Sequence, residues 1–399
     1  MIKENKIKAY ILKNALEHNG NAQINPIINS LFNEGLKKKD IPKTIPIIHK
    51  IIDEINKLTI EQQQNEFEKL INLIGKRETR QGLPELANVK KQIIMRFAPS
   101  PSGPLHIGHA LTASLSYLYV KRYGGKFYIR IEDTNPENIY KPAYKMIKDE
   151  SKWLFNNPSI IIQSERMNLY YKYIEMLLKK NSAYICTCSQ EEFKKTITEM
   201  KECPCRHIPF KEQKDRWKNM LDRNGYKEGQ AVVRFKTSVK HKNPAFRDFP
   251  LARINLDFHP LQKNKYKVWP LMNLAVTVDD IELNITHIIR AKDHRDNAEK
   301  QKLIFKVLGK KYPESYFLGR IHLKDLILSS SQMRKDIEEG KYSGWDDHKL
   351  LTIASLKKQG YKPIAFHAFA EQIGLNEVDK NIDRKELFLL LNNFNTEKN

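Results

Sequence analysis

The segment that most constrains the fold of this 399-residue chain runs from residue 93 to about residue 123. Residues 93–97 are almost all apolar and predict a buried strand, a loop rich in Pro, Ser and Gly follows, and an amphipathic helix begins at residue 106. A strand, a tight loop and a helix N-terminus in this order direct free backbone N–H groups and the positive end of the helix dipole at one point. The sequence therefore predicts an α/β fold with a phosphate-binding site at the start of this helix.

Two histidines and a glycine at the start of the helix suit ATP. His106 and His109 lie three residues apart, so both rings face the same side of the first helical turn, where each can donate to a phosphate oxygen. Gly108 carries no side chain, so a flat adenine ring can lie against bare backbone. We predict a nucleotide site of the adenylate-forming kind, in which His106 and His109 neutralise phosphate charge and Gly108 contacts ATP.

The net charge of +22 favours a polyanionic partner such as nucleic acid, although solvated lysines of a Lys-rich proteome would give the same charge. No apolar run approaches the ~20 residues of a membrane span. The first residues, Met-Ile-Lys-Glu-Asn-Lys, lack the apolar region of a signal peptide. We expect a cytoplasmic protein that does not bind membranes.

The cysteines form two Cys-x-Cys pairs separated by fourteen residues. They are Cys186, Cys188, Cys203 and Cys205. Thiolates two residues apart on an extended segment can share one metal ion, and four thiolates suit tetrahedral Zn²⁺. Two disulfides are the alternative, which a reducing cytosol disfavours. The pattern predicts a zinc site.

Changes in hydrophobic pattern divide the chain into six segments. These are an N-terminal helical domain (1–76), a polar linker (77–91), a first α/β half (92–183), an insertion that holds the cysteines (184–265), a second α/β half (266–320) and a mixed C-terminal region (321–399). Alternating strands and helices in the two halves predict a parallel sheet with right-handed crossovers. In the helical domain, Pro46 is predicted to take the first position of a helix.

The residues 96–109 resemble the signature of class I glutamyl-tRNA synthetases of the archaeal/eukaryotic-type branch. Arg-Phe-Ala-Pro-Ser-Pro-Ser-Gly is followed by His-Ile-Gly-His, whereas the related glutaminyl enzymes typically carry Pro-Glu-Pro-Asn in this loop. The paired cysteines resemble the zinc knuckle of the archaeal enzymes, within the insertion that handles the tRNA acceptor end. The resemblance implies a Rossmann-type catalytic domain that activates L-glutamate with ATP and Mg²⁺ and transfers it to the 3′ end of tRNA-Glu.

The same resemblance implies a glutamate pocket. Arg96 and Arg290 match the arginines that hold the substrate's side-chain carboxylate, a task that suits a permanently charged, forked guanidinium. Glu132, within Arg-Ile-Glu-Asp-Thr-Asn, matches the carboxylate that takes the substrate ammonium group, and Ala98 and Ser100 line the same floor.

Residues 328–335 resemble the family's equivalent of the Lys-Met-Ser-Lys-Ser loop, with Ser330 at the position of the second lysine. The residues that this implies at the ATP phosphates are Ser329, Ser330 and Ser331, with Arg334 or Lys335 as the catalytic cation. The alternative is an ordinary helix start in which Ser331 is the N-cap and the basic side chains point into solvent.

The family's anticodon-reading β-barrels do not appear before Asn399, and the C-terminal region resembles the stem-contact fold. We therefore expect a fragment or a short form that lacks the anticodon-binding domain. The alternatives are a short paralog that transfers activated glutamate to another acceptor, such as a modified tRNA base, and a catalytically silent RNA-binding paralog. We expect a monomer, whose N-terminal helices form a packing domain or dock a protein partner.

Overall fold

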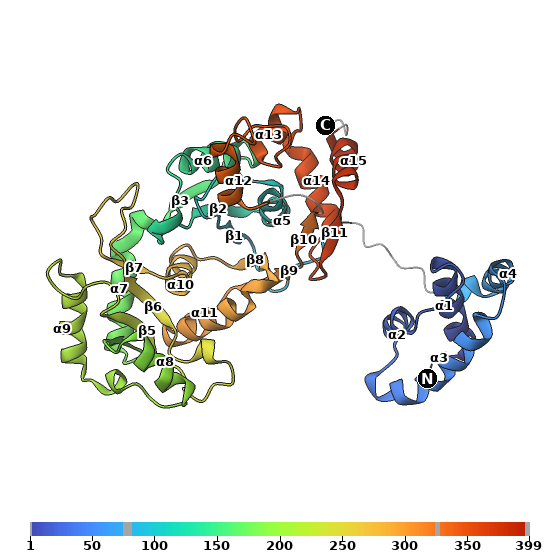
Figure 1. The fold of residues 1–399 in the computed structure, drawn as a ribbon, viewed down its shortest axis with the longest axis horizontal. Helices are drawn as coiled ribbons and strands as arrows, with labels where there is room; N and C mark the ends of the chain where they lie inside the picture. The colour runs from blue at the N-terminus through green and yellow to red at the C-terminus, as the bar shows by residue number, and fades with distance from the viewer. Residues whose placement is uncertain (1, 75–81, 324–327, 396–399) are drawn as a thin grey trace. The chain divides into compact units, whose positions relative to one another are not determined.

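The computed structural model describes residues 2–74, 82–323 and 328–395, and the chain divides into two compact units, Met1–Gln81 and Gly82–Asn399 (Figure 1). The predicted linker, 77–91, spans this boundary, and its first part, 77–81, lies outside the described residues. Leu86 in its second part is buried in the core of the larger unit, where its N–H donates to the Tyr123 hydroxyl.

The smaller unit is a bundle of helices. They are α1 (Glu4–Glu17), α2 (Ile24–Asn33), α3 (Ile41–Ile55) and α4 (Ile60–Leu70), with short 3-10 turns η1 (Lys38–Asp40) and η2 (Ile71–Leu73). Apolar residues at helical spacing, such as Ile7 and Ile11 in α1 and Ile48 and Ile51 in α3, form its own core. Thr59 begins α4 with a capping box.

The prediction that Pro46 starts a helix is wrong. α3 begins at Ile41, so that Pro42 lies in its first turn and Pro46 lies inside the helix. Proline has no N–H to donate to the preceding turn, which usually ends or kinks a helix. Here the residues on either side of Pro46, Thr44 and Ile48, are both buried, and this packing keeps the segment helical.

The larger unit contains the predicted parallel sheet. Its strands are β1 (Ile93–Phe97), β2 (Gly125–Ile131), β3 (Ser159–Ile162), β8 (His287–Ala291) and β9 (Glu314–Leu318). β1, β2 and β3 pair in parallel in that order, and β8 pairs in parallel with β9. The Thr286 N–H donates to the Ile94 carbonyl over 2.9 Å, which places β8 beside β1 and joins the two halves. The predicted α/β architecture is confirmed.

The helices of the two halves are α5 (Ile107–Tyr123), α6 (Ala143–Leu154), α7 (Met167–Lys179), α10 (Met272–Glu282) and α11 (Arg295–Val307). Helix α5 packs on the parallel sheet against β1, β2 and β8, whereas α7, α10 and α11 contribute side chains to a second core. An antiparallel sheet with its own core interrupts the two halves, and Trp217 and Trp269 are buried there. It consists of β4 (Ala183–Cys186), β5 (Val232–Phe235), β6 (Pro250–Ile254) and β7 (Val268–Pro270), with α8 (Gln190–Thr198) and α9 (Phe210–Leu221) beside it.

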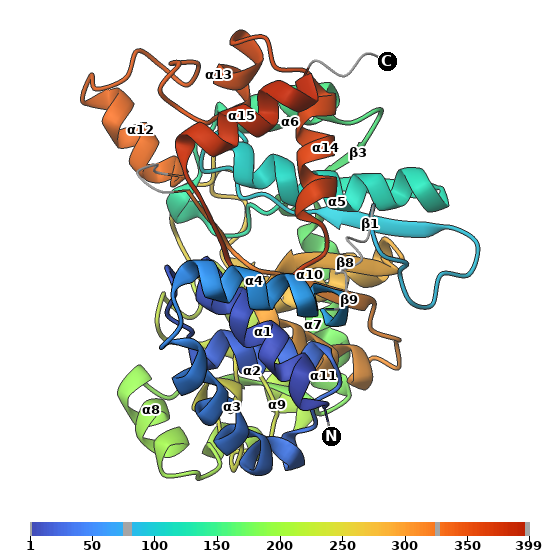
Figure 2. The ribbon, with the colours of Figure 1, turned by 90° about the vertical axis from the view of Figure 1, so that its right-hand side faces the viewer.

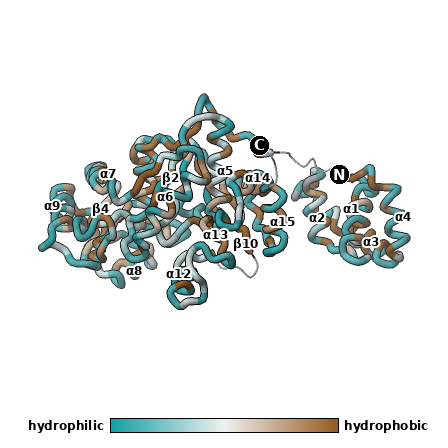
Figure 3. The backbone as a smooth tube through the Cα atoms, turned by 90° about the horizontal axis from the view of Figure 1, so that it is seen from above, coloured by the Kyte–Doolittle hydropathy of each residue, from teal (hydrophilic) through white to brown (hydrophobic). Residues whose placement is uncertain are grey.

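The C-terminal region adds a parallel strand pair and four helices. They are β10 (Ile321–Leu323) and β11 (Lys380–Ile382), with α12 (Ser330–Glu338), α13 (Ile353–Lys358), α14 (Pro363–Ile373) and α15 (Arg384–Asn395). α14 packs along α5, and Figure 2 shows α12 to α15 gathered on the same side of the sheet as α5 and α6. In Figure 3, β4 is coloured as hydrophobic, whereas the outlying α9 is largely hydrophilic. None of the helices in the described residues has both the length and the apolar character needed to cross a bilayer.

Candidate active site

The two histidines of the loop meet at the start of α5. His106 is the N-cap of α5 and His109 lies in its first turn, and their rings stack with centroids 3.7 Å apart. The Nδ1 atoms of both rings are buried and have no hydrogen-bond partner among the described residues. Burial lowers the pKa of His109 to about 4, and burial together with the neighbouring His109 lowers the pKa of His106 well below its usual range. Both rings are therefore neutral near pH 7 and can offer N–H donors rather than positive charge.

Backbone hydrogen bonds tie this loop to the C-terminal region. The Ile107 N–H donates to the Leu351 carbonyl over 2.9 Å, and the Ile353 N–H donates to the Leu105 carbonyl over 2.8 Å. The Leu105 N–H in turn donates to the Glu150 carboxylate of α6 over 2.7 Å. Three hydrogen bonds from two separate segments thus fix the backbone next to His106.

A cavity of about 610 Å³ lies at this helix start. Among the residues that line it are His106, Gly108, His109, Leu328 and Ser329. A Cβ atom on residue 108 would lie 3.2 Å from the His106 ring and 3.7 Å from Leu328, so glycine keeps this part of the cavity open. The predicted ATP residues of two distant segments therefore share one cavity.

The three serines at the start of α12, Ser329 to Ser331, have different surroundings. Ser329, not the predicted Ser331, is the N-cap of α12, and its hydroxyl accepts from the Gln332 N–H. The hydroxyl of Ser331 lies 3.0 Å from that of Ser329. Ser330 is buried against Gly103 of the first loop, where a Cβ on residue 103 would come within 2.9 Å of the Ser330 Cβ. Gly103 thus lets the two predicted ATP segments touch.

The basic residues of α12 lie away from the cavity lining. Arg334 lies over the Tyr140 ring and within ion-pair distance of Glu338, and Lys335 is exposed near Glu339. Of the described residues, the cations that do line the cavity are Arg320 and Lys380, which sequence reasoning missed. Neither lies in a sequence motif. Arg320 follows β9 and Lys380 begins β11, and only the fold brings the two residues to the start of α5.

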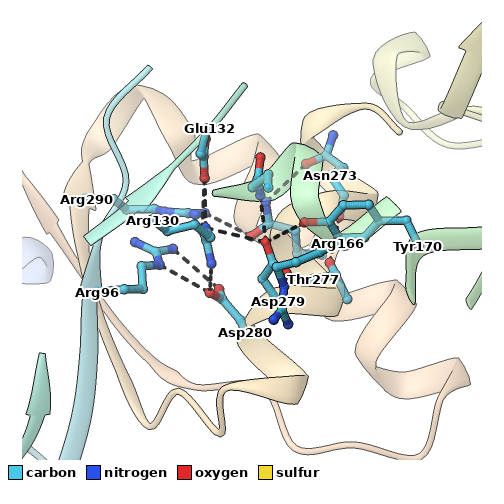
Figure 4. Close-up of polar contacts among 12 residues, drawn as sticks. Arg96, Arg130, Glu132, Arg166, Tyr170, Asn273, Thr277, Asp279, Asp280 and Arg290 are labelled. Atoms are coloured by element: carbon cyan, nitrogen blue, oxygen red, sulfur yellow. Dashed lines mark hydrogen bonds and ion pairs between the residues drawn. The ribbon is translucent and has the colours of Figure 1, made fainter. Parts of the chain in front are cut away.

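The predicted glutamate residues lie in a buried network of ion pairs (Figure 4). The Nε and Nη2 groups of Arg96 donate to the Asp280 carboxylate over 3.2 and 3.4 Å. Arg130 is buried between two carboxylates, with Nη1 2.5 Å from Asp280 and Nη2 2.9 Å from Glu132. Although burial acts to raise it, Arg96 and Arg130 hold the pKa of Asp280 below its ordinary value.

The adjacent Asp279 extends this network to α7. Its carboxylate accepts from Gln163, Arg166 and the Tyr170 hydroxyl over 2.8 to 2.9 Å. Sequence reasoning missed Arg130, Asp279 and Asp280. Two consecutive acids after an apolar helical run are the signal that could have marked the aspartates, because such carboxylates need buried cations.

Arg290 completes the pocket from β8. It is partly buried, and Nη1 donates to the Gln301 side chain over 3.0 Å. Burial and the nearby Arg96 lower the pKa of Arg290 to about 10. The described ion pairs join Arg96, Arg130 and Arg166 to Glu132, Asp279 and Asp280, and none of them includes Arg290 (Figure 4). Such a pocket favours an anionic ligand.

The remaining predicted pocket residues follow β1. The Glu132 N–H donates to the Pro99 carbonyl over 2.9 Å, so the backbone between Ala98 and Ser100 lies beside Glu132. Ala98 is partly buried and Ser100 is exposed. The described hydrogen bonds of the network do not include the Ser100 side chain.

The four cysteines come together as predicted. Their sulfur atoms all lie within 4.8 Å of one another, with Cys203 3.7 Å from Cys186 and 3.5 Å from Cys188. These distances exceed a disulfide bond and match the ~3.8 Å edge of a tetrahedral zinc–thiolate site. The donor set therefore fits Zn²⁺.

Two contacts surround this cluster. Arg216 of α9 directs an N–H at the Cys205 sulfur over 3.4 Å, which suits a thiolate. Arg206, next to Cys205, pairs with the buried Asp248, whose carboxylate also accepts from the Tyr184 hydroxyl over 2.8 Å. The cluster is thereby fixed to the insertion's sheet.

The parallel sheet is divided into two halves by the insertion, and its first crossover helix, α5, begins at the histidine loop. This combination is typical of class I aminoacyl-tRNA synthetases. The family model "tRNA synthetases class I (E and Q), catalytic domain" matches residues 92–398, and the chain belongs to this family.

The chain is 41% identical over 389 residues to the glutamate--tRNA ligase of Methanocaldococcus jannaschii, which covers 97% of this chain and 70% of that protein. It is also 41% identical over 387 residues to the glutamate--tRNA ligase of Pyrococcus furiosus, with 94% and 67% covered. In fold it is similar to the crystal structure of a glutamate tRNA ligase from Elizabethkingia meningosepticum, with a TM-score of 0.54, 22% identity, and 75% and 69% of the two chains covered. The predicted resemblance to archaeal-type enzymes is confirmed.

Proposed function

We propose that this chain is a glutamate–tRNA ligase, which activates L-glutamate with ATP and transfers it to the 3′ end of tRNA-Glu. One observation carries the choice of amino acid: burial and the nearby Arg96 lower the pKa of Arg290, and Arg290 has no carboxylate partner among the described ion pairs. The side-chain carboxylate of glutamate would supply the missing partner of Arg290, whereas glutamine would leave this partly buried guanidinium without an anion.

In this proposal, Arg290 and the unused donors of Arg96 bind the side-chain carboxylate of glutamate. Glu132 binds the substrate ammonium group: the hydrogen bonds that the structure describes from Arg130 go to Oε1 of Glu132, which leaves Oε2 for the substrate. The backbone at Ala98 and Ser100 forms the floor beside it. These residues place the α-carboxylate near the cavity at His106.

ATP occupies the cavity at the start of α5. His106 and His109 donate from neutral rings to its phosphates, Gly108 lies against adenine, and Ser329 contacts the phosphates from the other side. Mg²⁺ bound with ATP supplies further charge neutralisation. We assign the protein's cations to Arg320 and Lys380, since both line the cavity, in preference to Arg334 and Lys335.

Zn²⁺ bound by Cys186, Cys188, Cys203 and Cys205 would hold the end of β4 and the turn before α9 together. Its part is structural, because all four positions are taken by protein thiolates. The ion would stabilise the insertion, through which the acceptor end of tRNA approaches.

Charging assays test the proposal. Purified protein is incubated with ATP, tRNA-Glu transcript and either glutamate or glutamine, and pyrophosphate exchange is measured with and without tRNA. We expect stable charging of tRNA-Glu with glutamate alone. Exchange that needs no tRNA, with glutamate not attached to the 3′ end, would favour the paralog that uses another acceptor. Tight RNA binding without any exchange would favour the silent paralog.

A further inference from the structure

The side chain of Gln301 holds Arg290 in the candidate glutamate pocket. Gln301 lies on α11 and is fully buried, and its Oε1 atom accepts from Nη1 of Arg290 over 3.0 Å. A guanidinium group has only donors, so the atom that faces it must be the amide oxygen. The amide Nε2 atom donates in another direction, to Oδ1 of Asn273 on α10 over 3.3 Å. Asn273 and Arg290, both labelled in Figure 4, thus fix the orientation of the amide from its two ends.

The partner of Arg290 differs from those of the other arginines in the network. Each of the others contacts a carboxylate, as in the pairs of Arg96 with Asp280 and of Arg166 with Asp279. Arg290 has a neutral amide in the corresponding place, and the ion pairs that the structure describes do not include it. A neutral acceptor orients a guanidinium group without compensating its charge. The charge of Arg290 is therefore left available for a ligand.

A second buried glutamine in the same network has the opposite orientation. The Nε2 atom of Gln163 donates to the Asp279 carboxylate over 2.8 Å. Gln163 thus faces an anion with its donor, whereas Gln301 faces a cation with its acceptor. A carboxylate in place of the Gln163 amide would oppose Asp279, but one in place of the Gln301 amide would pair with Arg290. Position 301 is therefore the place in this network where an internal counter-ion for Arg290 would fit.

The neutral side chain at position 301 is not explained by packing or by stability. A glutamate side chain has the same number of heavy atoms as that of glutamine, so it would need no more room. A buried cation without a counter-ion opposes folding, and the lowered pKa of Arg290 agrees with this cost. The uncompensated charge instead suits an anionic ligand, whose carboxylate supplies the counter-ion when it binds.

We propose that Gln301 is a positioning residue that determines amino-acid specificity: its neutral amide orients Arg290 and leaves the guanidinium charge for the side-chain carboxylate of the substrate. This inference rests on the proposed function, because it takes glutamate as the ligand of Arg290. Gln301 acts through Arg290 and does not touch the reacting atoms. A carboxylate at position 301 would compensate the charge that the substrate needs, and would turn the pocket towards a neutral side chain such as that of glutamine.

Charging kinetics of two variants test this. Gln301→Glu supplies an internal counter-ion, so the KM for glutamate should rise roughly a hundredfold, with the KM for ATP unchanged, and the preference for glutamate over glutamine should fall by a similar factor. Gln301→Met keeps a neutral side chain of similar size and removes only the acceptor. Its KM for glutamate should rise about tenfold, and its preference for glutamate should remain. An unchanged KM for glutamate in Gln301→Glu, or an equal loss of preference in both variants, overturns the proposal.

Urea titrations without amino acid give a readout that does not depend on activity. Gln301→Glu should unfold at the wild-type urea midpoint or above it, because the new carboxylate pairs with Arg290. Gln163→Glu is the matched control and should unfold at a clearly lower midpoint, because its carboxylate faces Asp279. Equal destabilisation by the two substitutions, or a Gln301→Glu protein that does not fold, also overturns the proposal.

Charging by the wild-type protein is measured in parallel. If it charges tRNA-Glu with glutamate and the differences between the variants are missing, only the role of Gln301 fails. If the difference in urea midpoint is found and the wild-type protein does not charge glutamate, the neutral amide at Arg290 is supported and the proposed function alone fails.

Discussion

Arg130 and Asp280 form a fully enclosed ion pair, with Nη1 of the arginine 2.5 Å from Oδ1 of the aspartate. The same guanidinium holds Glu132 through Nη2, and the same carboxylate holds Arg96. Arg130 therefore fixes the position of Glu132, which we propose binds the substrate ammonium group, relative to Arg96, which we propose binds the side-chain carboxylate. The described contacts include none directly between Glu132 and Arg96.

The first prediction concerns this alignment. Arg130→Lys keeps the charge but replaces a planar fork by one ammonium group, which cannot reach both carboxylates in the same geometry. We expect the KM for glutamate to rise about tenfold or more, with the KM for ATP unchanged, in steady-state charging assays. Arg384→Lys on exposed α15 is a control that should alter neither. An unchanged KM for glutamate would mean that Glu132 and Arg96 are positioned independently.

The second prediction separates binding from stability at Arg290. Arg290→Gln removes the proposed partner of the substrate carboxylate, which should cost on the order of 3 kcal/mol, or roughly two decades in kcat/KM for glutamate. ATP affinity should barely change. If kinetics with glutamate stay as in the wild type, the specificity pocket does not include β8.

The same variant should be more stable without substrate. Burial lowers the pKa of Arg290 to about 10, so Arg290 stays charged at pH 7 but its charge is less favourable in the folded protein than in the unfolded chain and opposes folding. Removing that charge should raise the free energy of unfolding, measured in urea titrations, by about 2 kcal/mol. The effect is smaller than the pKa shift alone would give, because the group is only partly buried. Glutamate should stabilise the wild-type protein and not the variant. A less stable unliganded variant would contradict this account of the pocket.

Local sequence patterns predicted those parts of the site that depend on residues close together in the sequence. The strand, loop and helix from 93 to 123, and the Cys-x-Cys pairs, are short-range features that the structure confirms. The pairing of Arg130 with Asp280 spans 150 positions, and that of Arg96 with Asp280 spans 184. Such pairs follow from which strands and helices the fold places together, and no local period encodes them.

The placement of Ser330 illustrates the same limit. A sequence motif suggests a serine at the ATP phosphates, yet the structure packs Ser330 against Gly103 and leaves Ser329 as the cap. The prediction that Pro46 starts a helix was wrong for a different reason. Burial of the surrounding residues of α3 outweighed the low intrinsic propensity of proline for helix interiors.

The third prediction concerns the cysteine cluster. Metal analysis of purified protein should give about one zinc per chain, and Cys203→Ser should lose it, because three thiolates close a structural site poorly. Transfer to tRNA should fall more than ATP affinity, since the cluster lies in the insertion. Thr187→Ser, which keeps the hydroxyl 3.8 Å from the Cys205 sulfur and removes only a methyl group, is the control and should retain metal. Metal-free protein with four intact thiols and full transfer activity would rule out the zinc site.

The fourth prediction concerns the carboxyl group behind the phosphate loop. Glu150 accepts the Leu105 N–H next to His106, and burial raises its pKa from 4.5 to about 8. The folded protein therefore holds a proton on Glu150 that the unfolded chain releases between these two values. Stability from this group is complete below pH 4.5 and is lost as the pH rises through 8. Glutamine at this position is uncharged throughout and lacks that dependence.

Glu150→Gln should therefore gain stability relative to the wild type as the pH increases. Between pH 5 and pH 9 the difference in unfolding free energy between variant and wild type should shift by on the order of 2 kcal/mol in favour of the variant, measured by urea titration. Asp149→Asn, at the exposed neighbour that pairs with Lys145, should show no such shift. Because Glu150 also holds the loop beside His106, we expect the KM for ATP of the wild type to vary across this pH range and that of Glu150→Gln to vary less. Parallel pH profiles for the two proteins, in both stability and KM, would show that Glu150 does not titrate here.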